Sequence, residues 1–228
     1  MGNISNENFK FLKALAQNND RDWFTKNKSE YQIHHERMIS FADELLIKMN
    51  RHDNIETLNG KKSLHRIYRD VRFSKDKSPY KSHWGGGFKR ATKLLRGGYY
   101  YHIQPNRKSF IGGGFWAPNK EDLLRIRHDI SNNASDLREI IANSHFISTF
   151  GQLKGEQLKS SPKGFDKDHP DIDLLRYKQF IIGKQFTDKE VFADDFIEKA
   201  NDTFIKMRPL FDYMSDVLST DSNGTPLF

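Results

Sequence analysis

The fold is decided by one stretch, Tyr99-Tyr-Tyr-His-Ile-Gln-Pro-Asn-Arg-Lys-Ser-Phe-Ile-Gly-Gly-Gly-Phe115. Its first six residues are mostly aromatic or β-branched, a composition that strands favour. Alternation divides their side chains between two faces, with Tyr99, Tyr101 and Ile103 on one and Tyr100 and His102 on the other. Residues 105–108 have the composition of a turn, and residues 109–115 continue as a return strand. The stretch therefore predicts an antiparallel hairpin.

Helical patterns lie on both sides of this hairpin. Residues 8–17 repeat apolar groups at helical spacing, and a long helix is expected from 21 to 49. Another helix is expected after Asn119, which can cap it. The last helices follow the capping box Thr187-Asp-Lys-Glu190, and Pro209 is expected to separate two of them. Further strands are expected at 80–90 and 179–185. Helices, then strands, then helices predict an α+β fold with a mostly antiparallel sheet, on which a long N-terminal helical hairpin and C-terminal helices pack.

The length of 228 residues suits one large domain or two small ones with a shared core. There is no βαβ alternation and no linker, so we expect a single domain over 1–228, with a core at about 8–219 and a frayed tail at 220–228. Aromatic residues make up 13 % of the chain, which favours a folded, Phe-rich core over disorder.

Composition also excludes several classes of protein. The chain has no cysteine, so disulfides, thiolate catalysis, iron–sulfur clusters and Cys-ligated zinc are ruled out. The first ten residues contain no apolar signal core, and no run approaches the roughly 18 apolar residues of a membrane span. We therefore expect a cytoplasmic protein without a membrane partner. Its oligomeric state stays open.

Positive charge is concentrated beside the predicted hairpin. Residues 60–110 contain 14 Lys and Arg against two Asp, a net charge of +12. Because the whole chain carries +7, the remaining residues carry −5. A focused positive field favours an anionic partner. The alternative is a solvated basic loop that pairs with acidic helices of the same chain.

The most densely charged segment is Arg66-Ile-Tyr-Arg-Asp-Val-Arg-Phe-Ser-Lys-Asp-Lys-Ser-Pro-Tyr-Lys-Ser-His83. We expect a short helix through Asp70 and a loop from Ser74, and the alternative is a strand. The candidate anion-binding residues are Arg66, Arg69, Arg72, Lys75, Lys77 and Lys81, with Tyr80 and Tyr100 lining the pocket. Such guanidinium and ammonium groups bind phosphate or carboxylate oxygens. In the opposing interpretation, Asp70 binds Arg69 or Arg72 and the other charges are solvated.

Three residues are candidates for proton transfer if a reaction occurs, namely Asp70, His102 and His169. His169 lies in Asp166-Lys-Asp-His-Pro170, for which turn and capping chemistry is the more frequent explanation. The triple glycines at 85–87 and 112–114 lack the Gly-Lys-Ser/Thr of a phosphate-binding loop. The pattern implies no metal and no cofactor, and it leaves open whether the protein is an enzyme.

Aromatic residues alternate with these cations, namely Tyr68, Phe73, Tyr80, Trp84, Phe88, Tyr100 and Tyr101. Stacking aromatics beside cations are typical of single-stranded nucleic-acid binding, although aromatics on strands more often belong to a core. No RRM, KH or helix-turn-helix signature is present. Three functions stay open: binding of a phosphate-bearing small molecule, binding of nucleic acid, and protein interaction in which Arg and Asp form a structural clasp.

Four motifs together resemble one known family. They are the charged stretch up to Lys81, Phe11-Leu with Asn18-Asn-Asp-Arg-Asp-Trp-Phe24, Tyr99-Tyr-Tyr-His-Ile103 with Gly112-Gly-Gly-Phe-Trp116, and Pro162-Lys-Gly-Phe with Asp168-His-Pro and Leu174. Over roughly residues 9–211 the chain resembles domain of unknown function 2461, a mainly bacterial family that also occurs in fungi. The resemblance implies one domain. It carries no assigned activity and no accepted catalytic residues, so it does not choose among the three functions.

Overall fold

The computed structural model of the protein describes residues 4–221 and 225–227. It has an α+β fold with a four-stranded antiparallel sheet, which confirms the predicted fold class. The strands are β1 (Trp84–Lys89), β2 (Gly98–Ile103), β3 (Ser109–Phe115) and β4 (Phe180–Phe186), and they are adjacent in that order. The predicted hairpin is β2 with β3. Tyr99, Tyr101 and Ile103 are buried, whereas Tyr100 and His102 on the opposite face are half-buried, as alternation predicts.

The helices surround these strands in the sequence. They are α1 (Asn6–Gln17), α2 (Arg21–Lys26), α3 (Lys28–Met49), α4 (Gly60–Ser63), α5 (Lys120–Asn132), α6 (Ser135–Ala142), α7 (Ser144–Phe150), α8 (Ile172–Leu175), α9 (Asp188–Val191) and α10 (Phe196–Ser219). The prediction of a single long helix over 21–49 is wrong, because the helix is interrupted at Asn27, which separates α2 from α3. There the Asn27 side-chain amide donates to Trp23 O at 2.8 Å, which satisfies a carbonyl at the end of α2.

The described residues divide into two compact units. The first comprises the residues up to Phe88, Tyr100–Ile111 and Gln185–Asp202, and the second comprises Lys89–Tyr99, Gly112–Lys184 and the described residues from Thr203 onward. The single domain over 1–228 stays a prediction. Of the tail expected to fray, residues 222–224 and 228 lie outside the described residues, and Thr220 pairs with Pro226 as an isolated antiparallel bridge.

Aromatic contacts build the core of the first unit. Phe41 of α3 meets Tyr101 of β2 edge-on, with ring centroids 5.8 Å apart. The Tyr101 hydroxyl reaches across β1 to the Ser63 hydroxyl at 2.8 Å. This crossing requires Gly86, because a Cβ there would lie 2.2 Å from Tyr101 Oη. One face of the sheet in this unit is thus closed by α3.

In the second unit, α10 packs on β2 through Phe204 and Phe211, whose rings lie 5.0 and 4.9 Å from the Tyr99 ring. Pro209 was expected to end a helix, and this prediction is wrong because α10 continues through it. Pro209 is exposed, and so is Ile205, whose carbonyl loses the usual i+4 hydrogen bond. Water can reach that carbonyl, while the buried residues on the other side hold the helix together.

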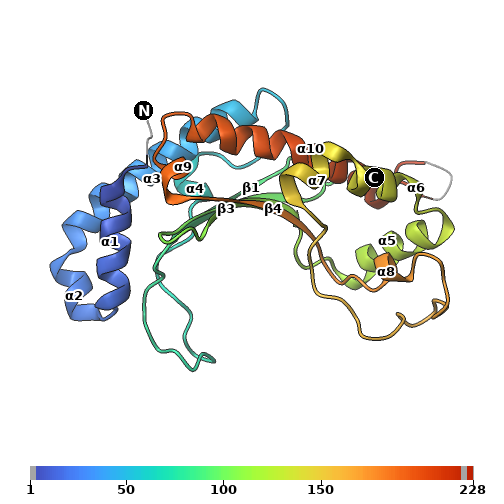
Figure 1. Cartoon of the computed structure of the whole chain (residues 1–228), viewed down its shortest axis with the longest axis horizontal. Helices are drawn as coiled ribbons and strands as arrows, with labels where there is room; N and C mark the ends of the chain where they lie inside the picture. Colours follow the sequence, from blue (N-terminus) through green and yellow to red (C-terminus); the bar gives the residue numbers. More distant parts are fainter. Residues whose placement is uncertain (1–3, 222–224, 228) are drawn as a thin grey trace. The chain divides into compact units, whose positions relative to one another are not determined.

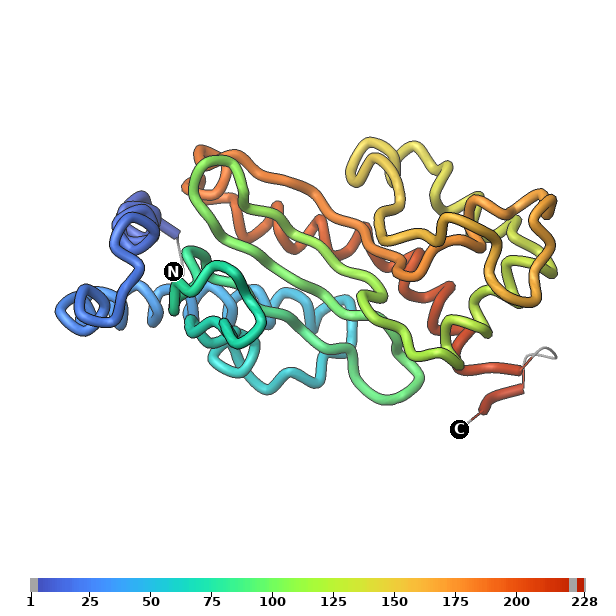
Figure 2. Tube along the Cα trace, turned by 90° about the horizontal axis from the view of Figure 1, so that it is seen from below, coloured from blue at the N-terminus to red at the C-terminus, as the bar shows by residue number. Residues whose placement is uncertain are grey.

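The charged stretch forms an extended arm, residues 66–82, and the helix expected through Asp70 is therefore wrong. Its backbone bonds join its two branches instead of successive turns. Arg69 N donates to Pro79 O at 2.9 Å, and Lys81 N donates to Ile67 O at 2.8 Å. In Figure 1 the arm extends from the sheet on the side opposite α3, and Figure 2 shows it as a loop whose branches run beside each other.

The base of the arm is held by a residue of the N-terminal region, Asn19. Asn19 donates to Tyr80 O at 2.9 Å and accepts from Tyr80 N at 3.0 Å, which imitates a strand pair. The Tyr80 ring stacks on Phe24 of α2 at 4.0 Å and is 5 % exposed. The arm is thereby anchored to α2. None of the described helices is both long and apolar enough to cross a bilayer.

Candidate functional site

Two of the predicted anion-binding arginines are occupied by carboxylates of the arm itself. Arg69 donates to Asp76 at 2.5 Å, and Arg72 holds both oxygens of Asp70, at 3.0 and 2.7 Å. The Ser78 hydroxyl and backbone N–H, followed by Arg69, lower the pKa of Asp76 to about 2. The Arg72 hydrogen bonds lower the pKa of Asp70. These pairs lie within the arm and not between the arm and acidic helices.

The other cations of the arm have no carboxylate partner among the described residues. The Lys77 ammonium donates to the carbonyl of Val71 at 3.0 Å. The Lys81 ammonium donates to Arg66 O, at 2.9 Å. The side chains of Arg66 and Lys75 make no hydrogen bond or ion pair within the described part of the chain. The uncompensated positive charge of the arm therefore lies on Arg66, Lys75, Lys77 and Lys81.

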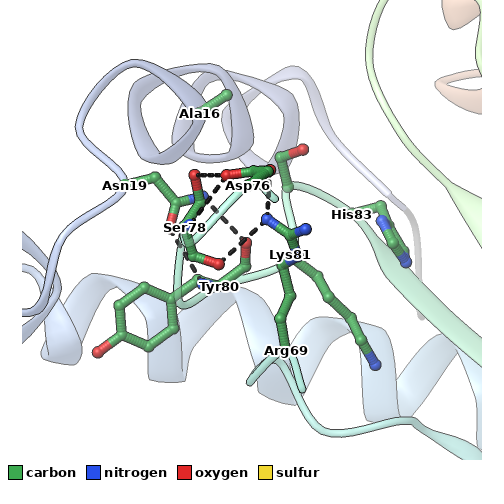
Figure 3. A pocket seen from close by; sticks show the side chains of 9 residues that line it. Ala16, Asn19, Arg69, Asp76, Ser78, Tyr80, Lys81 and His83 are labelled. Atoms are coloured by element: carbon green, nitrogen blue, oxygen red, sulfur yellow. Dashed lines mark hydrogen bonds and ion pairs between the residues drawn. The ribbon is translucent and has the colours of Figure 1, made fainter. Parts of the chain in front are cut away.

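A recess of about 300 Å³ opens at the base of the arm. It is lined by Ala16, Asn19, Arg69, Asp76, Ser78, Tyr80, Lys81, Ser82 and His83. Figure 3 shows the Arg69–Asp76 pair filling one side, while the ends of Lys81 and His83 point away from that pair. Tyr80 contributes little of its ring, because the ring stacks on Phe24.

Beside the recess, basic and aromatic groups gather on the open face of β1 and β2. We call this set the histidine face; its members are His65, Lys81, His83, Tyr100 and His102. The His83 ring lies 4.2 Å from the His102 ring, and the His65 ring lies 5.8 Å from the Tyr100 ring. A Cβ on Gly85 would lie 2.6 Å from Tyr100 Oη, so this glycine leaves room for the tyrosine to lie over β1.

The pKa values of these groups are all shifted in the direction that favours the neutral form of the side chain. Burial, followed by the charges of His102, Lys81 and His65, lowers the pKa of His83 to about 4. Partial burial and the Lys81 charge lower the pKa of His65, and burial and the Arg66 charge lower that of Lys81. Burial also lowers the pKa of His102 and raises that of Tyr100. No acidic group contributes to these shifts, so within the described part of the chain the histidine face is a basic site without an acidic partner.

His102 is held by hydrogen bonds at both ring nitrogens. Its Nε2 lies 2.8 Å from Gln104 Oε1, which can only accept, so Nε2 carries the proton. Nδ1 then accepts from the Tyr100 hydroxyl at 3.2 Å. The ring also stacks on Phe110 at 4.9 Å. His102 thus shapes the histidine face, and its nitrogens are already engaged.

His83 differs because its imidazole has no hydrogen-bond partner among the described residues. It is half-buried and lines the recess, so both features favour it for proton transfer over His102. Sequence reasoning did not single out His65 or His83. The available signal was the spacing of two residues between His83 and Gly85, which places both on the face that Tyr100 occupies.

The remaining proton-transfer candidates lie elsewhere. Asp70 sits near the tip of the arm, bound by Arg72. His169 belongs to the second unit, where Nδ1 accepts from the Asp171 backbone N–H at 3.0 Å and Nε2 lies 3.2 Å from Ser131. These bonds are those of a turn before α8. Within the described residues, no three His, Asp or Glu side chains are arranged to hold a metal ion.

Comparison with known proteins gives one match. A family model described as "conserved hypothetical protein (DUF2461)" matches residues 7–213, which is most of the chain. Neither the curated proteins nor the solved structures contain a match.

Proposed function

We propose that this chain, which belongs to the DUF2461 family as its motifs predicted, binds a small anion with a phosphate or carboxylate group on the histidine face. One observation carries the proposal: Lys81, His65, His83 and His102 adjoin one another, and none of them is paired with a carboxylate of the described residues. The recess next to Lys81 and His83 offers room for the ligand.

Electrostatics supports this occupant. Burial lowers the pKa values of the three histidines, the Lys81 charge lowers those of His65 and His83 further, and an anion bound beside them would raise these values again. Lys81 supplies the point charge, and a phosphate oxygen would accept hydrogen bonds from the protonated rings of His65 and His83. Because the anion raises the histidine pKa values, binding takes up protons and strengthens as the pH falls from 7 toward 6. We expect the ligand to be a cytoplasmic metabolite.

His83 is the residue to which we assign proton transfer if the bound anion reacts. Once the bound anion has raised its pKa, the protonated ring of His83 can donate a proton to an oxygen of the anion or of its leaving group. Tyr100 stays protonated because burial raises its pKa, and it serves as a hydrogen-bond donor.

The protein-interaction alternative draws support from the Arg69–Asp76 and Arg72–Asp70 pairs, which can hold the arm in one conformation as a structural clasp. It predicts that Asp70→Asn lowers stability without changing the response to any anion. Because this pair is exposed, the loss should be small.

A thermal-shift screen with inorganic phosphate, nucleotides, sugar phosphates and polyphosphate tests the anion proposal. A ligand at 100 times its Kd stabilises the folded state by about 2.7 kcal/mol. For a chain of this size that raises Tm by roughly 5–10 °C. The variant Lys81→Met should lose the shift, and the control Lys62→Met, an exposed lysine of α4, should keep it.

Calorimetry of the best ligand in two buffers with different ionisation enthalpies then measures proton uptake. Uptake that disappears in His83→Asn supports the proposed site. If every ligand of the thermal-shift screen raised the Tm of wild type and of Lys81→Met equally, the proposal would be refuted, because the ligand would then bind elsewhere.

A further inference from the structure

The tip of the arm carries an aromatic ring that nothing in the fold explains. Phe73 is 97 % exposed, so it contributes nothing to the core. Arg72 lies beside it, with Cζ 5.9 Å from the ring centroid. A second aromatic, Tyr68, is 54 % exposed on the shaft of the arm, where Tyr80 and Phe24 support its ring from behind.

Cations are interleaved with these two rings. Arg66 precedes Tyr68, Arg72 adjoins Phe73, and Lys75 follows it. Among the described residues, the side chains of Arg66 and Lys75 make no hydrogen bond or ion pair, and Arg72 is bound by Asp70 although its side chain is 77 % exposed. The arm therefore presents alternating rings and positive charges along its length.

We propose that the arm is a binding surface for single-stranded nucleic acid, on which bases stack against Phe73 and Tyr68 and phosphates contact Arg66 and Lys75. Stacking beside cations suits an extended polyanion with flat groups. An anionic lipid surface fits less well, because membrane binding grows with the apolar area that is buried, and Phe73 is the large apolar side chain that the tip exposes. This surface is separate from the histidine face, and the two proposals can fail independently.

The arm fits a single strand better than a duplex. Bases within a duplex are stacked on one another and leave no face for Phe73, whereas every base of a single strand can stack on a ring. Four other aromatics of the region cannot take part, because Tyr80, Trp84, Phe88 and Tyr101 are at most 5 % exposed. With two rings and two free cations, binding should be weak and salt-dependent.

Fluorescence anisotropy with a short labelled oligothymidine tests this proposal on the full chain. Neutralising two phosphates predicts a slope of log K against log salt of about −1.4, and Lys75→Ala should reduce it by about 0.7. Phe73→Ala should weaken binding about five-fold or more, since it removes one stacking platform. Trp116→Ala is the matched control, because Trp116 is 71 % exposed in the second unit and should have no effect.

Several results would overturn the proposal. They are equal affinities of Phe73→Ala and wild type, tighter binding to duplex than to single strand, and binding to anionic vesicles without binding to the oligonucleotide. Oligonucleotide binding that is lost in Lys81→Met but kept in Phe73→Ala would also overturn it and would place the strand at the histidine face. Because Phe73 is exposed, its removal should leave the fold intact, and circular dichroism checks this.

Discussion

His83→Asn should make the protein less sensitive to acid. The folded protein holds the pKa of His83 at about 4, whereas an unfolded chain has a value near 6.5. Between these two values the unfolded state binds a proton that the folded state does not. The free energy of unfolding of the wild type therefore falls as the pH decreases from 6.5 to about 4, and the loss is complete below the folded pKa.

The size of the loss follows from the same two values. One pKa unit corresponds to about 1.4 kcal/mol, so the neutral ring of His83 accounts for at most about 3 kcal/mol. Solvent reaches part of this half-buried ring and reduces that figure. The variant lacks the titrating group, and its stability should fall by that much less over the same range.

Urea unfolding followed by circular dichroism between pH 7 and about pH 4 measures the difference. His145→Asn is the matched control, since His145 is exposed on α7, and its curve should run parallel to the wild type. Saturating phosphate should reduce the acid loss of the wild type, compared with chloride at equal ionic strength, and change the His83→Asn curve less. Parallel curves for wild type and His83→Asn would refute the reasoning, because His83 would then titrate as in the unfolded chain.

Three further predictions concern stability, each measured by urea unfolding. Arg90→Met should lower the free energy of unfolding by about 3 kcal/mol, because the Arg90 side chain is 0 % exposed and donates to Asp212 Oδ1 at 2.6 Å and to Arg96 O at 3.0 Å. The control Arg208→Met removes a more exposed partner of the same carboxylate and should lower it by less than about 1 kcal/mol. Gly86→Ala should cost about 1–3 kcal/mol or more, since its Cβ would lie 2.2 Å from Tyr101 Oη and 2.7 Å from the Ser63 carbonyl oxygen, and an unchanged midpoint would contradict this close approach. Thr187→Ala should cost about 1 kcal/mol by removing the acceptor of the Glu190 N–H, and a neutral result would mean that the cap at α9 contributes nothing.

Elements stabilised by neighbours in the sequence could be predicted. Asn119 caps α5 by accepting from Asp122 N at 2.8 Å, and Thr187 with Glu190 forms the expected capping box. The hairpin of β2 and β3 follows from alternation and a short turn. In each case the groups that decide the structure are within a few residues, so a local pattern carries the information.

The arm and the last helix were decided by partners distant in the sequence. Asn19 pairs with the backbone of Tyr80, which is 61 residues away, and no local pattern contains that pair. Pro209 sits within α10 because packing outweighs a local helix-breaking preference. The histidine face likewise joins His65, which precedes the arm, with Lys81 and His83, which precede β1, and with two residues of β2, and pairing of the strands brings them together.

The charge of the arm illustrates how much a count of residues conceals. Asp70 and Asp76 are the only acids within residues 60–110, and both are taken by arginines of the arm. No carboxylate of this segment is left for Lys81 or for the histidines beside it. The net charge of +12 is therefore not spread evenly, since the arginine pairs are neutral, and among the described residues Lys81 is the unpaired cation of the arm that lines the recess. An anion gains most where positive groups are close together and lack partners, which favours the histidine face over the arginines that the sequence made prominent.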